Sequence, residues 1–181
     1  LGLEFAGVVE AVGSGVTQLA VGERVLGLGI GTFSTTVQAD ARELVRIPAQ
    51  LSFAEAATIP VAYLTALYAF EELANVRAGE RVLIHAAAGG VGMAALQLAQ
   101  LLGAEVFATA SPSKWHVLRA LGLPATHIAS SRDLGFEAQF RDQSGGAGMD
   151  VVLNSLAREY VDASLRLLRP GGRFLEMGKT D

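Results

Sequence analysis

The stretch that most constrains this chain runs from residue 81 to residue 103, RVLIHAAAGGVGMAALQLAQLLG. It begins with the apolar run Val82–Ile84, which is short enough to be a β-strand buried on both faces. A glycine turn follows, Gly89-Gly90-Val91-Gly92, and then an apolar pattern with helical spacing that ends near Gly103. A strand, a glycine turn and a helix present backbone N–H groups and a helix N-terminus to a phosphate. The stretch therefore predicts a turn that binds the pyrophosphate of a dinucleotide.

The glycine motif by itself is weak. The full pattern is G-x-G-x-x-G, whereas residues 87–92 read A-A-G-G-V-G, with Ala87 in place of the first glycine. Glycines also serve ordinary tight turns between a strand and a helix, so that alternative stands beside the dinucleotide interpretation. A second apolar run, residues 105–109, lies just beyond the expected helix. This context favours dinucleotide binding.

From residue 81 onward, apolar runs and helical patterns alternate. The expected strands are 81–86, 105–109, 126–129, 150–154 and 172–177, and the expected helices are 91–102, 113–121, 134–142 and 158–168. Such alternation predicts an α/β fold, a doubly wound parallel sheet of the Rossmann type. A full dinucleotide fold has a sixth strand, which we expect to be missing after Asp181.

The first part of the chain predicts β structure instead. Short apolar or alternating runs at 5–12, 24–28, 33–38 and 44–47 are separated by glycines. Ser52 and Glu55 have the spacing of a capping box, and Pro60 suits the first turn of a helix reaching about Ala74. We expect a partial β domain over residues 1–58, continuing a pattern from upstream, and the dinucleotide-binding domain over residues 59–181.

Composition excludes several classes of protein. The net charge is −4 and there is no basic cluster, so nucleic acid is not expected as a partner. The chain has no cysteine, which excludes disulfides, a thiol nucleophile and a cysteine-ligated metal. No apolar run approaches the ~18 residues that span a bilayer. The start, LGLEFAGVVE, lacks the basic region of a signal peptide. A cytoplasmic protein without a membrane span is expected.

The end of the second strand bears on the choice of cofactor. An NAD site usually has Asp or Glu there, bound to the ribose 2′-hydroxyl, but this strand ends Thr109-Ala110-Ser111. Two cations follow, Lys114 and, after Ser131, Arg132. The alternative is that both are solvated surface cations. Together with the glycine turn, they favour contact with a 2′-phosphate, and therefore NADP over NAD.

Several motifs then resemble a known family. The segments AAAGGVGMAA, SPSKW, HIASSR, DVVLNSL and GGRFLEMGKTD, with LGLEFAGVVEAVG at the start, are similar to enoyl reductase domains of modular type I polyketide synthases. These domains belong to the medium-chain dehydrogenase/reductase superfamily, as do quinone oxidoreductases and the related domain of animal fatty acid synthase. The resemblance covers essentially all 181 residues. It implies that the β domain is part of a GroES-like domain.

The resemblance implies an activity and a set of site residues. The activity is NADPH-dependent reduction of a 2-enoyl thioester on an acyl carrier protein, in polyketide or fatty-acid synthesis. Hydride goes to the β carbon and a proton to the α carbon, with Lys179 as the candidate proton donor. The implied cofactor-binding residues are Thr65, Gly89, Gly90, Val91, Gly92, Met93, Ser111, Lys114, Ser131, Arg132 and Asn154. Thr65 and Asn154 match positions near the nicotinamide.

Some features depart from the family pattern or leave alternatives open. Leu3 stands where zinc-dependent relatives have histidine, so no metal is expected. Two other catalytic candidates of the family fall outside the chain, so we expect an incomplete active site. A free-standing NADPH:quinone oxidoreductase and a non-catalytic NADPH-binding scaffold within the synthase remain alternatives. The open edge of the last strand, 172–177, predicts pairing into a homodimer.

Overall fold

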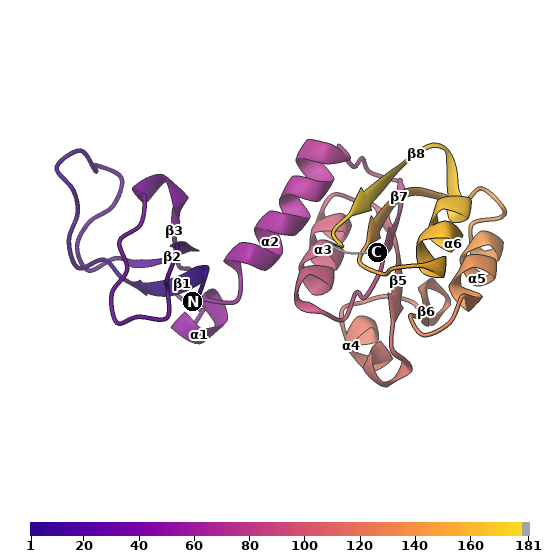
Figure 1. The fold of residues 1–181 in the computed structure, drawn as a ribbon, viewed down its shortest axis with the longest axis horizontal. Helices are drawn as coiled ribbons and strands as arrows, with labels where there is room; N and C mark the ends of the chain where they lie inside the picture. The colour runs from indigo at the N-terminus through magenta and orange to yellow at the C-terminus, as the bar shows by residue number, and fades with distance from the viewer. Residues whose placement is uncertain (179–181) are drawn as a thin grey trace. The chain divides into compact units, whose positions relative to one another are not determined.

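The structure, a computed structural model, describes residues 1–178 and forms two compact units that divide between Leu64 and Thr65. The division falls within helix α2 (Pro60–Leu67), while the boundary expected from the sequence lies just before that helix. The colours of Figure 1 follow the chain from the first unit into the second.

The first unit contains a small antiparallel sheet in the order β1-β2-β3, formed by Glu4–Val8, Arg24–Leu28 and Leu44–Arg46. A 3₁₀ turn, η1 (Ala41–Glu43), precedes β3. Helix α1 (Phe53–Ala56) begins at the expected capping box: Glu55 N–H donates to Ser52 Oγ, and Ser52 N–H donates to the Glu55 carboxylate. Leu26, Ile47 and Ala56 form the small core.

The expectation of a strand over residues 33–38 is wrong. The structure has no strand there, and Phe33 is 83% exposed. The run contains Ser34, Thr35 and Thr36, and Ser34 Oγ donates to the Thr36 carbonyl. Hydroxyl side chains offer the backbone local bonds that compete with a sheet ladder, which explains the difference. The first predicted strand is also shorter than expected, because β1 ends at Val8.

The second unit is built on a parallel sheet in the order β6-β5-β4-β7-β8. These strands are β4 (Arg81–Ile84), β5 (Glu105–Ala110), β6 (Ile128–Ser130), β7 (Met149–Asn154) and β8 (Leu168–Glu176). β4 lies in the middle, with β5 and β6 on one side and β7 and β8 on the other. The strand order reverses at β4, and ligands of open α/β sheets bind at such a switch point. The Rossmann-type fold expected from the sequence is confirmed.

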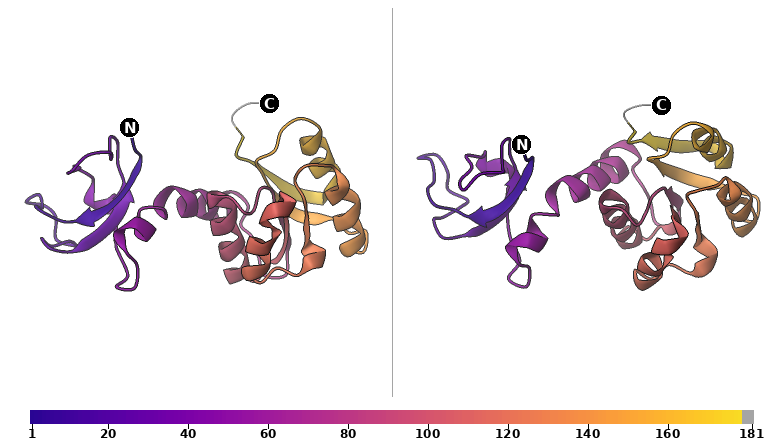
Figure 2. Two further views of the ribbon diagram at one scale, coloured as in Figure 1. Left: turned by 90° about the horizontal axis from the view of Figure 1, so that it is seen from below. Right: turned by 60° about the horizontal axis from the view of Figure 1, so that its bottom comes forward.

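Helices cover both faces of this sheet. They are α3 (Gly90–Leu101), α4 (Trp115–Ala120), α5 (Gly135–Gln143) and α6 (Glu159–Leu167), with short 3₁₀ turns η3 (Pro112–Lys114) and η4 (Ala125–His127). Figure 1 and Figure 2 show α5 and α6 together on one face, with α3 on the other. The core between the sheet and α5 and α6 contains Leu83, Phe107, Phe136, Phe140, Met149, Val152 and Leu167, among others.

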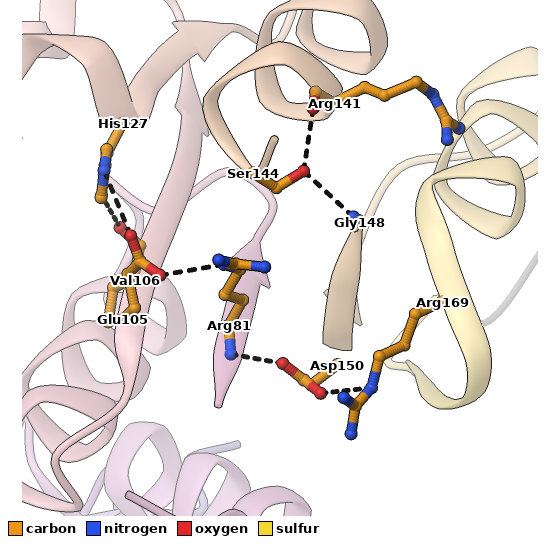
Figure 3. A network of polar contacts seen from close by, with 9 residues as sticks. All are labelled: Arg81, Glu105, Val106, His127, Arg141, Ser144, Gly148, Asp150 and Arg169. Atoms are coloured by element: carbon orange, nitrogen blue, oxygen red, sulfur yellow. Dashed lines mark hydrogen bonds and ion pairs between the residues drawn. The ribbon is translucent and has the colours of Figure 1, made fainter. Parts of the chain in front are cut away.

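An ionic network lies at the amino ends of the central strands (Figure 3). Asp150 is buried; its carboxylate accepts from the Arg81 N–H at 2.7 Å and pairs with Arg169 at 2.5 Å. The Arg81 side chain pairs with Glu105 at 3.0 Å, which joins β4 to β5. These charges therefore hold the sheet together at the edge opposite the carboxyl ends, where ligands of this fold bind.

One helical stretch bears on the expectation about membrane spans. Residues Phe53–Leu73, which include α1, α2 and the π-helix η2 (Tyr68–Leu73), are long and apolar enough to cross a membrane by length and composition. The sequence-based expectation, that no uninterrupted apolar run approaches ~18 residues, stands beside this finding, because the stretch contains Glu55 and Pro60. The core helices of soluble proteins meet the same criterion of length and composition.

A strained residue at the start of α6 gives a stability prediction. Arg158 has φ 59° and ψ −133°, a conformation that costs an L side chain about 1–3 kcal/mol and costs glycine little. Arg158→Gly removes this strain, and the greater entropy of glycine in the unfolded chain offsets part of the gain. We therefore expect the free energy of unfolding to rise by about 1 kcal/mol. Urea unfolding followed by the fluorescence of Trp115, the only tryptophan, measures it. Arg158→Ala keeps the strain and is the control; equal effects of the two changes would contradict the explanation.

Candidate functional site

The loop between β4 and α3 makes a sharp turn. Ala86 has φ 49°, in the left-handed region, and the N–H of Gly89 donates to the Ala86 carbonyl at 2.9 Å. The N–H of Ala87 donates to the Thr109 carbonyl on β5, also at 2.9 Å. The first bond closes the turn, and the second ties it to the neighbouring strand β5 just before α3 begins.

The N-terminus of α3 has free donors. The first helical bond runs from the Met93 N–H to the Gly89 carbonyl at 2.8 Å. Within residues 1–178, no acceptor is found for the N–H groups of Gly90, Val91 and Gly92, and no acidic residue lies in this first turn. The positive end of the helix dipole adds to these donors, so the turn suits an anion such as a pyrophosphate.

The glycines of this turn have different reasons to be glycine. A Cβ on Gly92 would lie 2.5 Å from Ala87 Cα and 2.6 Å from the Ala86 oxygen, so the helix packs directly against the turn. A Cβ on Gly89 would lie 3.2 Å from the same oxygen. A Cβ on Gly90 would meet nothing within 4 Å. Gly92 therefore serves packing, while Gly90 leaves open space at the free donors.

A pocket of about 150 Å³ lies at the carboxyl ends of β4, β5 and β6. Five of the residues predicted to bind the cofactor line it together: Gly89, Ser111, Lys114, Ser131 and Arg132. Among the residues that the structure describes, neither Lys114 nor Arg132 forms an ion pair with a carboxylate. Two unpaired cations in one pocket have the charge that suits a doubly charged anion such as a phosphate monoester.

Sequence reasoning missed the other residues of this pocket, Ala86, Ala88 and Ala110. The run of small residues before Gly89 is the only signal that could have indicated the first two. A positive φ is normally predicted from glycine, so nothing in the sequence marked Ala86 as the residue at the turn.

The remaining predicted residues lie elsewhere. Val91 and Met93 follow in the first turn of α3, and Thr65 is half-buried in α2. Asn154 is fully buried; its amide donates to the Leu156 carbonyl and to the Glu176 carboxylate, both at 2.7 Å. Asn154 therefore organises the loop after β7, and neither it nor Thr65 lines the pocket. The candidate catalytic residue, Lys179, lies outside the described residues.

A buried histidine lies directly before the turn. His85 is 1% exposed; its ring nitrogens contact Thr109 Oγ1 at 2.9 Å and Ser164 Oγ at 2.8 Å. The edge of its ring meets Phe136 at 5.0 Å between centroids. Burial lowers the pKa of His85 from 6.5 to about 4, so the imidazole is neutral at physiological pH.

The first unit has a larger, open groove of about 1020 Å³, lined by β1 and by the segments 9–18 and 32–44. Its ionisable side chains include Asp40 and Arg42, which pair with each other at 2.6 Å. The Arg42 guanidinium lowers the pKa of Asp40 to about 2. In the described part of the chain no three His, Asp or Glu residues gather as a metal site. We therefore place the candidate site at the carboxyl edge of the parallel sheet.

Comparisons with known proteins show the family of the chain. Residues 90–181 match the zinc-binding dehydrogenase family, and residues 1–49 match the alcohol dehydrogenase GroES-like domain. The chain is 64% identical over 181 residues to the pikromycin polyketide synthase component PikAII of Streptomyces venezuelae, covering all of this chain and 5% of that protein. Its curated relatives are much longer; it spans between 3% and 11% of their length.

Solved structures give the same result. The CurK enoyl reductase is 49% identical with a TM-score of 0.92, over 99% of this chain and 55% of that one. A mycobacterial protein solved in complex with NADPH is 31% identical with a TM-score of 0.86, over 98% of this chain and 56% of that one. The similarity thus covers both units of this chain and about half of each solved protein.

Proposed function

Since the chain belongs to the zinc-binding dehydrogenase family, as an enoyl reductase domain of the polyketide synthase type, we propose that it reduces an enoyl thioester with NADPH. The substrate would be carried on an acyl carrier protein of the same synthase, in the cytoplasm. The observation that carries the proposal is the free N-terminus of α3 beside a pocket with two unpaired cations. This arrangement fits a dinucleotide that bears a third phosphate.

The assignment of NADPH over NADH rests on charge. β5 ends at Ala110 with no acid to accept from a ribose 2′-hydroxyl, and Lys114 and Arg132 line the pocket there. We assign these two cations to the 2′-phosphate and the N–H groups of Gly90–Gly92 to the pyrophosphate. The bound NADPH of the mycobacterial relative supports this choice.

The chemistry divides between the cofactor and the protein. When bound, NADPH would supply the hydride for the β carbon of the substrate. The protein then has to stabilise negative charge on the thioester oxygen and deliver a proton to the α carbon. We assign the proton to Lys179. We also propose that the reaction needs no zinc, since the chain has no cysteine and has Leu3 in place of a histidine ligand.

The first experiment is a titration of the protein with NADPH and with NADH. Trp115 reports binding, because its Nε1 donates to the carbonyl of Ala110, which lines the pocket. We expect NADPH to bind more tightly by about 1–3 kcal/mol, the contribution of one or two charge-assisted bonds. Equal affinity for the two nucleotides would contradict the assignment of the cations.

Substitution of the two cations tests the assignment directly. Lys114→Ala with Arg132→Ala should weaken NADPH binding about 10- to 100-fold and leave NADH binding nearly unchanged, because only NADPH has the 2′-phosphate. Arg119→Ala removes an exposed cation of α4 that does not line the pocket, and is the matched control. An equal loss of NADPH affinity in Arg119→Ala would indicate a general effect of lost positive charge and would contradict a direct contact of Lys114 and Arg132 with the 2′-phosphate.

Experiments on the intact synthase distinguish the alternative functions. Lys179→Ala should reduce the rate of enoyl reduction while NADPH still binds; an unchanged rate would favour a scaffold role. Activity on a soluble quinone and none on an enoyl thioester would favour a quinone oxidoreductase. We also propose a homodimer formed through β8, whose only partner strand in the described residues is β7.

A further inference from the structure

The turn that we assign to the pyrophosphate holds an unfavourable conformation. Ala86 has φ 49°, in the left-handed region, which is less favourable for an alanine than the right-handed region. Gly92 packs against the turn from the helix side, as shown by the 2.5 Å between Ala87 Cα and a Cβ built on that glycine. Other contacts must hold Ala86 in place, and they lie on the side of the sheet.

Thr109 supplies those contacts. Its hydroxyl accepts from the Ala86 N–H at 3.3 Å, and its carbonyl accepts from the Ala87 N–H at 2.9 Å. Thr109 is fully buried, so no water competes for these bonds. A single residue of β5 therefore binds two successive N–H groups of the turn.

A chain of hydrogen bonds fixes the direction of the Thr109 hydroxyl. Ser164 Oγ donates to the Tyr160 carbonyl at 2.7 Å, so it accepts from His85 Nε2 at 2.8 Å. With the proton on Nε2, His85 Nδ1 is an acceptor, and Thr109 Oγ1 donates to it at 2.9 Å. The oxygen of Thr109 is then left to accept from Ala86. The low pKa of His85 is consistent with this neutral tautomer.

We propose that Thr109, His85 and Ser164 are positioning residues that hold the strained Ala86 turn in the shape that binds the pyrophosphate. The proposal rests on the proposed function of that turn. None of the three lines the pocket, and all are buried, so they act through the backbone of residues 86 and 87. The hydroxyl of Thr109 is the central group, because it joins the turn to the buried chain.

The test compares Thr109→Val with Thr109→Ser. Valine keeps the branched shape but leaves the Ala86 N–H and His85 Nδ1 without a partner, whereas serine keeps the hydroxyl. Each variant is titrated with NADPH and with adenosine 2′-monophosphate, which carries the 2′-phosphate and no pyrophosphate. Circular dichroism first establishes that the variants are folded at the temperature used.

For Thr109→Val we expect the Kd for NADPH to rise about tenfold and that for adenosine 2′-monophosphate to change less than about twofold. Thr109→Ser should bind both ligands as the parent chain does. A folded Thr109→Val with unchanged NADPH affinity would overturn the proposal. An equal loss of affinity for both ligands in Thr109→Val would also overturn it, and so would an equal loss of NADPH affinity in Thr109→Ser. A merely structural role predicts those results.

A second variant, Ser164→Ala, tests the proposal if Thr109→Val does not fold. Ser164→Ala removes the acceptor of His85 Nε2 at the far end of the chain, and should weaken NADPH binding about threefold without affecting adenosine 2′-monophosphate. Unchanged NADPH binding by Ser164→Ala would overturn the proposal. The parent chain tests the proposed function separately. If the parent chain binds neither ligand, the proposed function fails and the positioning role fails with it. If the parent chain binds NADPH and the variants bind it equally well, only the positioning role fails.

Discussion

Replacing Gly92 with alanine is expected to lower the free energy of unfolding by about 2 kcal/mol, although alanine normally gains ~1 kcal/mol over glycine inside a helix. The new methyl group would lie 2.5 Å from Ala87 Cα and 2.6 Å from the Ala86 oxygen. Both are backbone atoms, so no side chain can rotate away, and α3 or the turn must shift. Urea unfolding followed by Trp115 measures the loss.

Gly90→Ala is the matched change in the same turn. It lies two residues earlier in α3, and its added methyl would meet nothing within 4 Å. Stability should therefore stay the same or rise by up to ~1 kcal/mol. The methyl group would occupy the open space beside the free N–H groups, so NADPH binding should weaken about tenfold or more.

The two glycine variants thus have opposite profiles. Gly92→Ala is expected to unfold more easily, whereas Gly90→Ala is expected to be stable and to bind NADPH poorly. A stable Gly92→Ala would mean that α3 moves freely against the turn. Undiminished NADPH binding by Gly90→Ala would mean that the pyrophosphate does not approach the helix N-terminus at this point.

The parallel sheet and its alternation with helices could be predicted from the sequence because their signals are local and repeated. The run Val82–Ile84 is buried on both faces, and each later strand is followed or preceded by a helical pattern of suitable length. The capping box at Ser52 is a similar local signal, since both of its hydrogen bonds join residues three positions apart.

Features that depend on contacts between distant segments could not be predicted in this way. The left-handed Ala86 is held by Thr109, which lies 23 residues further along the chain. His85 meets Ser164, which is 79 residues away, and no spacing in the sequence relates the two. The pocket cations were predicted because Lys114 and Arg132 each closely follow a strand whose carboxyl end forms the site.

The run at 33–38 shows that a local sequence signal can also mislead. Its residues have the composition of a strand, with Phe33 and Val37 spaced among threonines. A strand also needs a partner, and this run forms no ladder in the structure. Local composition therefore favours a strand without determining one.

Acidification from pH 6.5 to pH 4 is expected to lower the free energy of unfolding by about 3 kcal/mol through His85 alone. Burial lowers the pKa of His85 from 6.5 to about 4, so the unfolded chain binds a proton in this range and the folded chain does not. Stability is therefore lost as the pH falls through this window, and the loss from His85 is complete below about pH 4.

Other groups contribute mainly below about pH 4.5. The pKa values of Glu23, Glu55 and Glu137 are lowered from 4.5, in each case chiefly by a side-chain hydrogen bond, so their stabilisation is lost only at pH values below about 4.5. Between pH 5 and pH 6.5, the change of the free energy of unfolding with pH should therefore come from His85. Trp115 lies in the same unit as His85 and reports its unfolding.

A His85→Gln variant isolates the contribution of the histidine. Glutamine cannot titrate in this range and can still hydrogen-bond, so the variant should be less stable at pH 7 but nearly independent of pH between 5 and 6.5. Urea unfolding of the parent chain and the variant at several pH values gives the two slopes. If both chains lost stability in parallel, the proton would bind elsewhere in the unfolded state, and the neutral His85 that fixes the Thr109 hydroxyl would lose its support.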